Sequence, residues 1–221
     1  MINIALCGYG AMGKVVEQEI KTYESINLCG ILSPTNGKFG EDLNNIDVII
    51  DFSNPANIDF LLNFAKEKKS ALLICTTGFS QEQKIRIKEA GDDIPVLLSS
   101  NTSTGVNALR KILKLISKDL YNFDIDIIER HHNKKVDAPS GTAKTLAEDI
   151  MKETGREKIE TISMRAGTIP GEHTVIFSGV DEVIEIKHTA YSKKIFARGA
   201  LDLALKLIEK GPGYYLMEEL F

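Results

Sequence analysis

The sequence predicts an α/β fold, in which a Rossmann-like domain built on a parallel sheet is joined to a second, mixed α+β domain. Short apolar runs alternate with amphipathic stretches over roughly the first hundred residues, as expected for βαβ units. A glycine-rich loop directly follows the first apolar run. After Ser99 a helical pattern is followed by segments with the alternation of strands, which marks the second domain.

Short segments rich in Ile, Leu and Val are the expected strands of the parallel sheet, since strands covered on both faces have this composition. They are Ile2–Cys7, Asn27–Leu32, Asp47–Asp51, Ala71–Cys75 and Pro95–Leu98. Pro55–Lys68 is expected to be a helix because Pro55 stands near its start and apolar residues follow at one-face spacing. Ser80–Ala90 is expected to be another, with Ser80 and Gln83 in capping-box register.

The remainder of the chain predicts helices and alternating strands in a mixed order. The expected helices are Thr104–Ile116, Ser140–Lys152 and Phe196–Lys210, the last of which stops at Gly211, Pro212 and Gly213. The expected strands are Phe123–Glu129, Glu160–Arg165, Thr174–Ser178 and Val183–Ala190. Tyr214 and Tyr215 are expected to pack the C-terminal tail.

The composition is that of an ordinary globular protein, with 221 residues of which 43% are hydrophobic and 26% charged. A net charge of −4 argues against nucleic-acid binding, which calls for a basic face. We expect no membrane partner and a cytoplasmic location, because no apolar stretch approaches the ~18 residues needed to span a bilayer and no leader is evident. Cys7, Cys29 and Cys75 are widely spaced, so buried reduced thiols are expected.

A G-x-G-x-x-G motif, made of Gly8, Gly10 and Gly13 with Ala11 and Met12 between them, joins the first strand to a helix. The first glycine permits a tight turn, the second lets the backbone approach a pyrophosphate, and the third allows close packing of helix on strand. The helix N-terminus would then face the anion. The motif could be a mere turn, but its context favours a nicotinamide dinucleotide.

The second expected strand is not followed by the acidic residue that usually binds an adenosine ribose. Ser33 and Lys38, with Thr35 and Asn36 between them, could instead donate hydrogen bonds to a 2′-phosphate. Ordinary turn residues would give the same pattern. The sequence therefore predicts that NADPH is tolerated and leaves NADPH or NADH open as the cofactor.

Polar segments follow three of the expected strands, at the edge where a doubly wound sheet binds its ligand. Each of them alone is more often a turn or a helix cap, but together they favour a crevice for the nicotinamide. The residues assigned to this crevice are Phe52, Ser53, Cys75, Thr76, Thr77, Ser99, Asn101 and Thr102.

The segment from Glu129 to Ala143 combines two adjacent histidines, two lysines and a helix start. His131 suits proton donation near neutral pH, because an unperturbed imidazole has a pKa of about 6.5. Lys135 could supply charge, and the amides of Gly141 and Thr142 could hold a substrate carboxylate. No metal is expected, since adjacent histidines in a strand point apart and no further ligand completes a set. A solvated basic loop is the alternative.

These motifs resemble the 4-hydroxy-tetrahydrodipicolinate (dihydrodipicolinate) reductase family nearly from end to end. The run Lys135–Ala143 is the most specific of them. The others are Gly8–Gly13, Asp51–Ser53, Thr76–Gly78, Ser103–Asn107, His131–Thr142, Arg165–Gly167, Gly171–Thr174 and Phe196–Ala200. Cys75 stands where the family usually has glycine, and Thr102 where an aromatic residue usually follows Asn101.

The resemblance implies reduction of 4-hydroxy-tetrahydrodipicolinate to tetrahydrodipicolinate in the diaminopimelate route to lysine. It implies that His131 donates the proton, Lys135 assists catalysis and binds a carboxylate, and His132 contacts the substrate. Ser140, Gly141 and Thr142 would grip a carboxylate of this small dicarboxylate. The implied domains are a dinucleotide-binding domain of residues 1–103 and 192–221, and a substrate-binding and oligomerisation domain of residues 104–191 that builds a homotetramer.

Two other functions remain open from the motifs alone. A different amino-acid dehydrogenase, such as an aspartate-dehydrogenase-like protein, shares the glycine loop but does not need the His131–Thr142 arrangement. A dinucleotide-sensing regulator would normally bring a DNA-binding segment, and no basic helix-turn-helix is evident. Arg165, Glu172 and His173 are expected chiefly to bracket a pair of strands.

Overall fold

The computed structural model describes residues 1–38 and 43–220, except for the side chain of Thr35. The chain divides into two compact units, Met1–Ser103 with Lys194–Phe221, and Thr104–Lys193. The second boundary falls two residues after the expected one. Each unit has its own sheet and its own helices.

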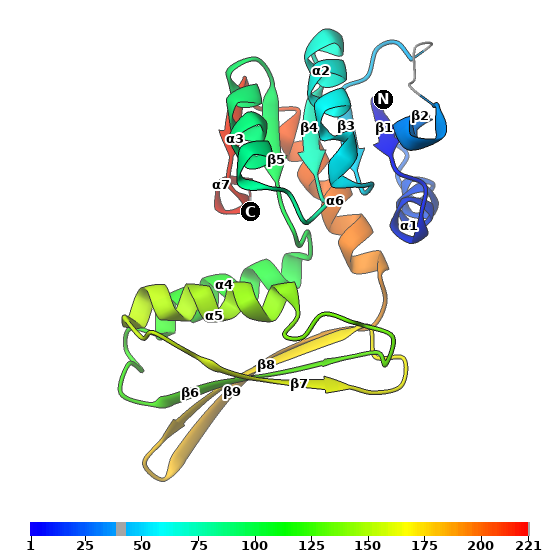
Figure 1. Cartoon of the computed structure of the whole chain (residues 1–221). Coiled ribbons are helices and arrows are strands. Elements are labelled where there is room, and N and C mark those ends of the chain that lie inside the picture. Colours follow the sequence, from blue (N-terminus) through cyan, green and yellow to red (C-terminus); the bar gives the residue numbers. More distant parts are fainter. Residues whose placement is uncertain (39–42, 221) are drawn as a thin grey trace. The chain divides into compact units, whose positions relative to one another are not determined.

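The first unit is built on a six-stranded parallel sheet with the order β10-β5-β4-β3-β1-β2 (Figure 1). Its strands are β1 (Ile2–Cys7), β2 (Ile26–Leu32), β3 (Val48–Asp51), β4 (Ala71–Ile74), β5 (Pro95–Leu98) and β10 (Gly213–Tyr215). The five strands expected from composition are confirmed. Because β2 and β3 flank β1 on opposite sides, the strand order reverses at β1, immediately before the glycine loop.

The sixth strand, β10, was not expected, because Tyr214 and Tyr215 were assigned to tail packing. Tyr214 instead pairs with Val96 of β5. A strand of three residues is too short to show alternation in the sequence. Gly91 makes the approach possible, since a Cβ at that position would lie 2.6 Å from the backbone nitrogen of Tyr214.

Helices cover both faces of this sheet. They are α1 (Ala11–Ile20), α2 (Ile58–Lys68), α3 (Gln81–Glu89), α6 (Lys194–Leu207) and α7 (Met217–Leu220), with short 3-10 turns at Pro34–Asn36, Pro55–Asn57 and Ala90–Asp92. The capping box at α3 is confirmed, because Ser80 and Gln83 each bond the other's backbone. The predicted helix Pro55–Lys68 begins as a 3-10 turn, and α6 lies two to three residues before its expected position.

Alternation along the strands divides the first unit's core in two. Val48 and Ile50 of β3 join a cluster with residues of α1 and α6, whereas Ile49 joins a cluster with residues of α2 and α3. Cys7 and Cys75 are buried free thiols as expected, but Cys29 is only partly buried. Helices therefore pack on both faces of the sheet, and the loops that follow its strands have defined positions.

The second unit holds a four-stranded mixed sheet with the order β7-β6-β8-β9. Its strands are β6 (Asp124–His131), β7 (Glu160–Arg165), β8 (Gly171–Gly179) and β9 (Glu182–Ala190). Figure 1 shows α4 (Thr104–Ile116) and α5 (Gly141–Thr154) lying along one face of it. Leu109, Leu146 and Phe177 are fully or nearly buried in the core between helices and sheet.

Two strands of this unit extend by two or more residues beyond a predicted end. β6 continues two residues past Glu129, and β8 begins three residues before Thr174. The extra residues are polar, so the apolar pattern did not reveal them. The extension places His131 within β6 and His173 within β8, on the face that α5 covers, because side chains alternate along a strand. None of the helices in the described residues is long and apolar enough to cross a membrane.

Candidate functional site

The glycine loop of the first unit contains two glycines that packing requires and one that it does not. Gly8 has φ +89°, and a Cβ there would lie 2.4 Å from the carbonyl oxygen of Phe52. A Cβ on Gly13 would lie 2.1 Å from the carbonyl oxygen of Gly8. A Cβ on Gly10 would meet nothing within 4 Å. Gly10 therefore leaves open space where a ligand can approach the backbone.

A cavity of about 740 Å³ opens beside this loop, at the carboxyl ends of β1, β2 and β3. It is lined by Gly8, Tyr9, Gly10, Ile31, Ser33, Asn36, Lys38, Phe52, Ser53, Asn54 and Asn57. None of these lining residues is acidic, and neither is any residue in the first turn of α1. Ala11, the first residue of α1, is exposed, and Met12 packs against the core. The site suits a dinucleotide pyrophosphate, because helix N-termini attract anions.

The loop after β2 gathers the residues expected to face a 2′-phosphate. The backbones of Ser33 and Lys38 bond each other at 2.8 and 3.0 Å, and Asn36 donates from its amide to the Ser33 hydroxyl. The side chain of Thr35 lies outside the described part of the chain. Ser33, Asn36 and Lys38 thus belong to one tight turn on the rim of the cavity.

Several residues assigned to the nicotinamide crevice have buried side chains at the ends of β4 and β5. Cys75, Ser99 and Thr102 are nearly inaccessible, whereas Thr77 is exposed. Burial, with the nearby charge of Asp51, raises the pKa of the Cys75 thiol well above its usual value. The Ser99 hydroxyl donates to the carbonyl oxygen of Asn101. These side chains do not line the cavity beside the glycine loop.

The structure gives a reason for one departure from the family pattern, the threonine at position 102 in place of an aromatic residue. Its hydroxyl donates to the carbonyl oxygen of Phe196 at 2.6 Å, so a threonine here joins the end of β5 to α6. A Cβ on Gly199 would lie 1.8 Å from the Thr102 carbonyl oxygen, which shows how closely the two segments approach. Thr76 has a comparable internal role, since its hydroxyl accepts from the Ser53 amide.

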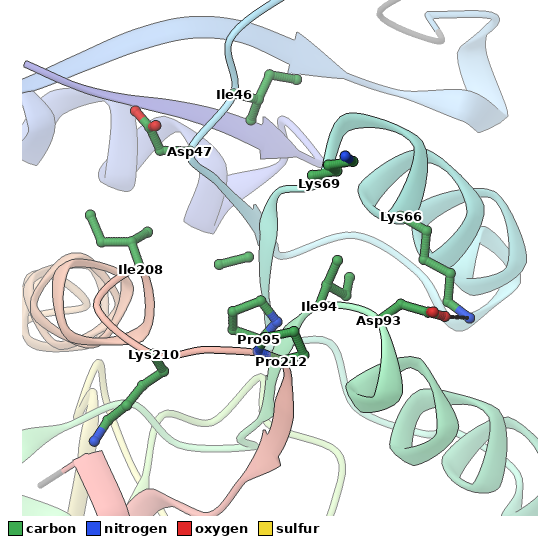
Figure 2. A pocket seen from close by; sticks show the side chains of 11 residues that line it. Ile46, Asp47, Lys66, Lys69, Asp93, Ile94, Pro95, Ile208, Lys210 and Pro212 are labelled. Atoms are coloured by element: carbon green, nitrogen blue, oxygen red, sulfur yellow. Dashed lines mark ion pairs between the residues drawn. The ribbon is translucent and has the colours of Figure 1, made fainter.

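A second cavity, of about 780 Å³, lies at the opposite edge of the same sheet, where β3, β4 and β5 begin (Figure 2). Its walls include apolar side chains. Its charged side chains contact other groups or point away from the cavity. Lys66 forms an ion pair with Asp93 at 2.9 Å, and Asp47 accepts from the Asn3 amide. Figure 2 shows the side chain of Lys210 pointing away from the other lining residues. No set of polar groups converges here, so the cavity by the glycine loop is the better candidate.

The second unit brings a buried acid–histidine pair together on β6. Glu129 and His131 are two residues apart, so both side chains point to the helix-covered face. Glu129 is 0% exposed and His131 8% exposed, and the Nδ1 atom of His131 lies 2.5 Å from Oε2 of Glu129. Arg165 of β7 donates to both carboxylate oxygens, at 2.7 and 2.9 Å. Arg165 therefore holds the Glu129–His131 pair in place from the neighbouring strand β7.

The start of α5 is attached to the same cluster. The Ser140 amide donates to Oε1 of Glu129 at 3.1 Å, and the Ser140 hydroxyl accepts from the Ala143 amide as the helix cap. The same hydroxyl lies 2.9 Å from Nε2 of His173, whose ring packs edge-on against His131 at 5.2 Å between centroids. Ser140 was expected to grip a carboxylate, and the structure places its hydroxyl inside the protein as a cap.

Charges in this cluster differ strongly from those of free side chains. Burial raises the pKa of Glu129, but hydrogen bonds from Arg165, Ser163 and His131 overcome this and lower it to about 2. Burial lowers the pKa of His173 to about 4. Burial also lowers the pKa of His131, while Glu129 opposes that shift. At neutral pH Glu129 is thus ionised and His173 neutral.

The ionised Glu129 decides which nitrogen of His131 carries the permanent proton. A carboxylate can only accept hydrogen bonds, so Nδ1 of His131 must be the donor in this pair. The other nitrogen, Nε2, is then the atom that gains and loses a proton. It lies next to Gly171, where a Cβ would come within 3.1 Å of it.

The loop between β6 and α5 holds the other expected substrate residues. Lys135 forms an ion pair with Asp137 at 2.7 Å, a partner that the sequence did not reveal. His132 is partly exposed, and Gly141 and Thr142 are the first two residues of α5. The first turn of α5 contains no acidic residue, so its N-terminus is suited to an anion.

Sequence reasoning assigned no role in the site to Glu129, and expected Arg165 and His173 chiefly to bracket strands. A usable signal was present for Glu129, since its spacing from His131 puts both on one face of a strand. Within residues 1–38 and 43–220, no cluster of three or more His, Cys, Asp or Glu side chains is arranged to hold a metal ion.

Comparisons with known proteins connect both units to one family. A family model described as dihydrodipicolinate reductase, N-terminus, matches residues 2–102, and one described as dihydrodipicolinate reductase, C-terminus, matches residues 105–221. The 4-hydroxy-tetrahydrodipicolinate reductase of Exiguobacterium sp. is 41% identical, with 100% of this chain and 96% of the relative covered. That of Clostridium novyi is 38% identical, with 99% and 98% covered.

A solved structure has the same fold. It is a dipicolinate-bound dihydrodipicolinate reductase from Paenisporosarcina sp. TG-14, with a TM-score of 0.80 and 21% identity over 98% of this chain and 97% of that one. A myo-inositol dehydrogenase from Corynebacterium glutamicum is less similar, with a TM-score of 0.62 and 16% identity over 96% and 90%. Both family models and the curated relatives agree over the whole length, and the chain therefore belongs to the dihydrodipicolinate reductase family.

Proposed function

We propose that this protein reduces 4-hydroxy-tetrahydrodipicolinate to tetrahydrodipicolinate with NADH or NADPH, with the 4-hydroxyl group leaving as water, in the diaminopimelate route to lysine. Relatives named for this reaction are similar to the chain from end to end. The observation that carries the proposal is within the second unit, where the titrating imidazole of His131 shares one buried carboxylate with the N-terminus of α5. A protonable nitrogen and an anion-binding helix start are what reduction of a dicarboxylate requires.

The first unit is proposed to hold the dinucleotide, with its pyrophosphate at Gly10 and Ala11. The open space at Gly10 and the absence of acidic lining residues among the described ones support this. The nicotinamide supplies hydride when bound, and the protein supplies binding and orientation. The rim residues Ser33, Asn36 and Lys38 would accept either adenosine ribose, so both NADH and NADPH are proposed as cofactors.

The second unit is proposed to bind the dicarboxylate and to complete the reduction with a proton. The amides of Gly141 and Thr142 would bind one carboxylate at the helix start. Lys135 would contribute positive charge, and His132 would contact the ring. His131 would donate a proton from Nε2, since Nδ1 is committed to Glu129.

We also propose that the protein is a cytoplasmic homotetramer assembled through the second unit. The face of its sheet opposite α4 and α5 carries exposed apolar side chains: Ile162 is 54%, Met164 47% and Val183 60% exposed. Ile162 and Met164 are two residues apart on β7 and so point to the same side, and exposed apolar side chains that gather in this way are typical of protein interfaces. A cytoplasmic location would give access to the pool of reduced nicotinamide cofactor. Sedimentation analysis of the purified protein tests the oligomer.

The proposed activity is tested by a coupled assay in which a synthase generates 4-hydroxy-tetrahydrodipicolinate in the cuvette. Oxidation of the reduced cofactor is followed optically, with NADH and NADPH in separate reactions. We expect substrate-dependent oxidation with at least one of them. If a folded protein oxidises neither, the proposal is wrong, and oxidation of amino acids with the oxidised cofactors then tests the dehydrogenase alternative.

A further inference from the structure

We propose that Glu129 is a positioning residue, which fixes the proton-donating orientation of His131 and, through the Ser140 amide, fixes the start of α5 beside it. This inference rests on the proposed function, in which His131 is the proton donor. Glu129 itself does not touch the substrate in this account. It acts through the two groups that do.

The carboxylate of Glu129 is completely buried, and both of its oxygens are hydrogen-bonded. One oxygen, Oε2, contacts His131 Nδ1 at 2.5 Å and Arg165 at 2.9 Å. The other, Oε1, accepts from Arg165 at 2.7 Å and from the Ser140 amide at 3.1 Å. A buried carboxylate is unfavourable unless it is paired and hydrogen-bonded. The bonds of Glu129 therefore fix the positions of the three residues that donate to it, His131, Arg165 and Ser140.

Glu129 also sets the tautomer of His131. Because Glu129 is ionised and can only accept, it holds the proton on Nδ1 and leaves Nε2 to titrate. It also stabilises the imidazolium form that must exist before a proton can be given away, which offsets the effect of burial. Without the carboxylate the ring would lose both its preferred tautomer and part of its basicity.

The same carboxylate connects the proposed proton donor to the proposed anion site. Ser140 caps α5 through its hydroxyl, and its amide is anchored to Glu129. Arg165 extends the connection, since it also donates to the carbonyl oxygen of Asp137, and the carboxylate of Asp137 is paired with Lys135. A displaced Glu129 would therefore shift the proton donor, the helix start and the lysine together.

The test compares Glu129→Gln with a matched control, Asp149→Asn. Asp149 is a buried carboxylate of α5 in the same unit, held at both oxygens by Arg110 at 2.6 and 3.1 Å. Its partners are Arg110 and Lys114 rather than His131, so losing its charge imitates the structural cost of losing Glu129. We expect Glu129→Gln to lower kcat by at least about 100-fold with a smaller change in KM, as for the loss of general-acid catalysis. Asp149→Asn should lower stability and leave kcat and its pH profile unchanged.

Nitrogen NMR of the histidine rings gives a readout that does not depend on activity. In the wild-type protein without substrate, the uncharged His131 ring should carry its proton on Nδ1. In Glu129→Gln this preference should be lost, and the pKa of His131 should fall further. Glu129→Asp keeps the charge on a shorter side chain, so it should retain more activity than Glu129→Gln.

The outcomes separate this inference from the proposed function. An active wild-type enzyme whose Glu129→Gln variant keeps its kcat and pH profile would overturn the positioning role and leave the function intact. A wild-type tautomer with the proton on Nε2 would also overturn it, even if Glu129→Gln failed to fold. An inactive wild-type protein with the Nδ1 tautomer would reject the proposed function while supporting the placement of Glu129.

Discussion

The two proposed anion sites are both helix N-termini, but they are built in different ways. The start of α1 has Gly10 as its N-cap and no side-chain cap, and its shape comes from backbone contacts that only glycine allows at Gly8 and Gly13. The start of α5 is capped by Ser140 and attached to a buried network of charged side chains. The first site therefore depends on the shape of the backbone, whereas the second depends on the charges beneath it.

This difference predicts that mild acid lowers the stability of the second unit selectively. All four histidines lie in residues 131–188, within that unit. In the unfolded chain His173 becomes protonated as the pH falls below about 6.5. In the folded protein its pKa is about 4, so it stays neutral until the pH falls that far. The unfolded state then binds more protons, so the free energy of unfolding decreases with falling pH. The shift of His173 corresponds to about 3 kcal/mol across this window.

Urea unfolding of the wild type and of His173→Phe between these pH values measures the effect. The variant loses its hydrogen bond to Ser140 and starts from lower stability, but its dependence on pH should be flatter. Glu129 adds a later loss between its unfolded value of about 4.5 and its folded value of about 2. Equal slopes for the wild type and the variant would show that His173 is not held neutral.

Alanine substitutions in the glycine loop should divide into two kinds. Gly13→Ala puts a Cβ against the carbonyl oxygen of Gly8, and overpacking of this kind costs about 1–3 kcal/mol. Gly10→Ala should fold normally, because its Cβ meets no protein atom within 4 Å, and should weaken dinucleotide binding instead. Thermal unfolding and calorimetric titration with cofactor distinguish them. Normal cofactor affinity in Gly10→Ala would argue against the proposed pyrophosphate position.

A comparison of Ser140→Ala with Ser80→Ala tests whether the cap of α5 has a role beyond stabilising its helix. Each change removes a helix cap and should lower the free energy of unfolding by about 1 kcal/mol. Only Ser140→Ala also frees His173 and alters the proposed carboxylate site, so only it should raise the KM for substrate. If both variants keep the wild-type KM, the Ser140 hydroxyl does not order the start of α5 for substrate binding.

The smallest expected effect is at the rim of the first site. Lys38→Met removes an exposed charge that would face a 2′-phosphate, which is worth about 1 kcal/mol or less. The KM for NADPH should rise modestly while that for NADH stays constant. Equal changes for the two cofactors would mean that Lys38 does not distinguish them.

The geometry of the glycine loop was easier to predict from the sequence than that of the cluster around His131, for the same physical reason that separates the two. A glycine loop is encoded locally, since positive φ and close backbone contacts demand glycine at fixed spacing. The cluster around His131 is assembled from β6, β7, α5 and β8, which supply Glu129, Arg165, Ser140 and His173. No local sequence pattern predicts that these four residues come together. The strand extensions that bring them together were not predicted either, because the ends of β6 and β8 are polar.

Elements with strong periodicity or clear caps were predicted within a few residues, including β1, β5, β7 and α4, whose bounds agree with the expected ones. The strand β10 was missed because three residues at a sheet edge carry no period. The burial of Thr102 could not be inferred either, since it depends on α6, which is distant in the sequence, contacting the loop after β5.

The central claim, proton donation from Nε2 of His131 in a reductase, is tested most directly by the pH dependence of kcat in the coupled assay. A proton donor must be protonated, so kcat for the wild type should fall as pH rises through the pKa of His131. His131→Gln should lower kcat by about 100-fold or more without this pH dependence, while leaving cofactor affinity unchanged. Wild-type turnover in a folded His131→Gln protein would contradict the account.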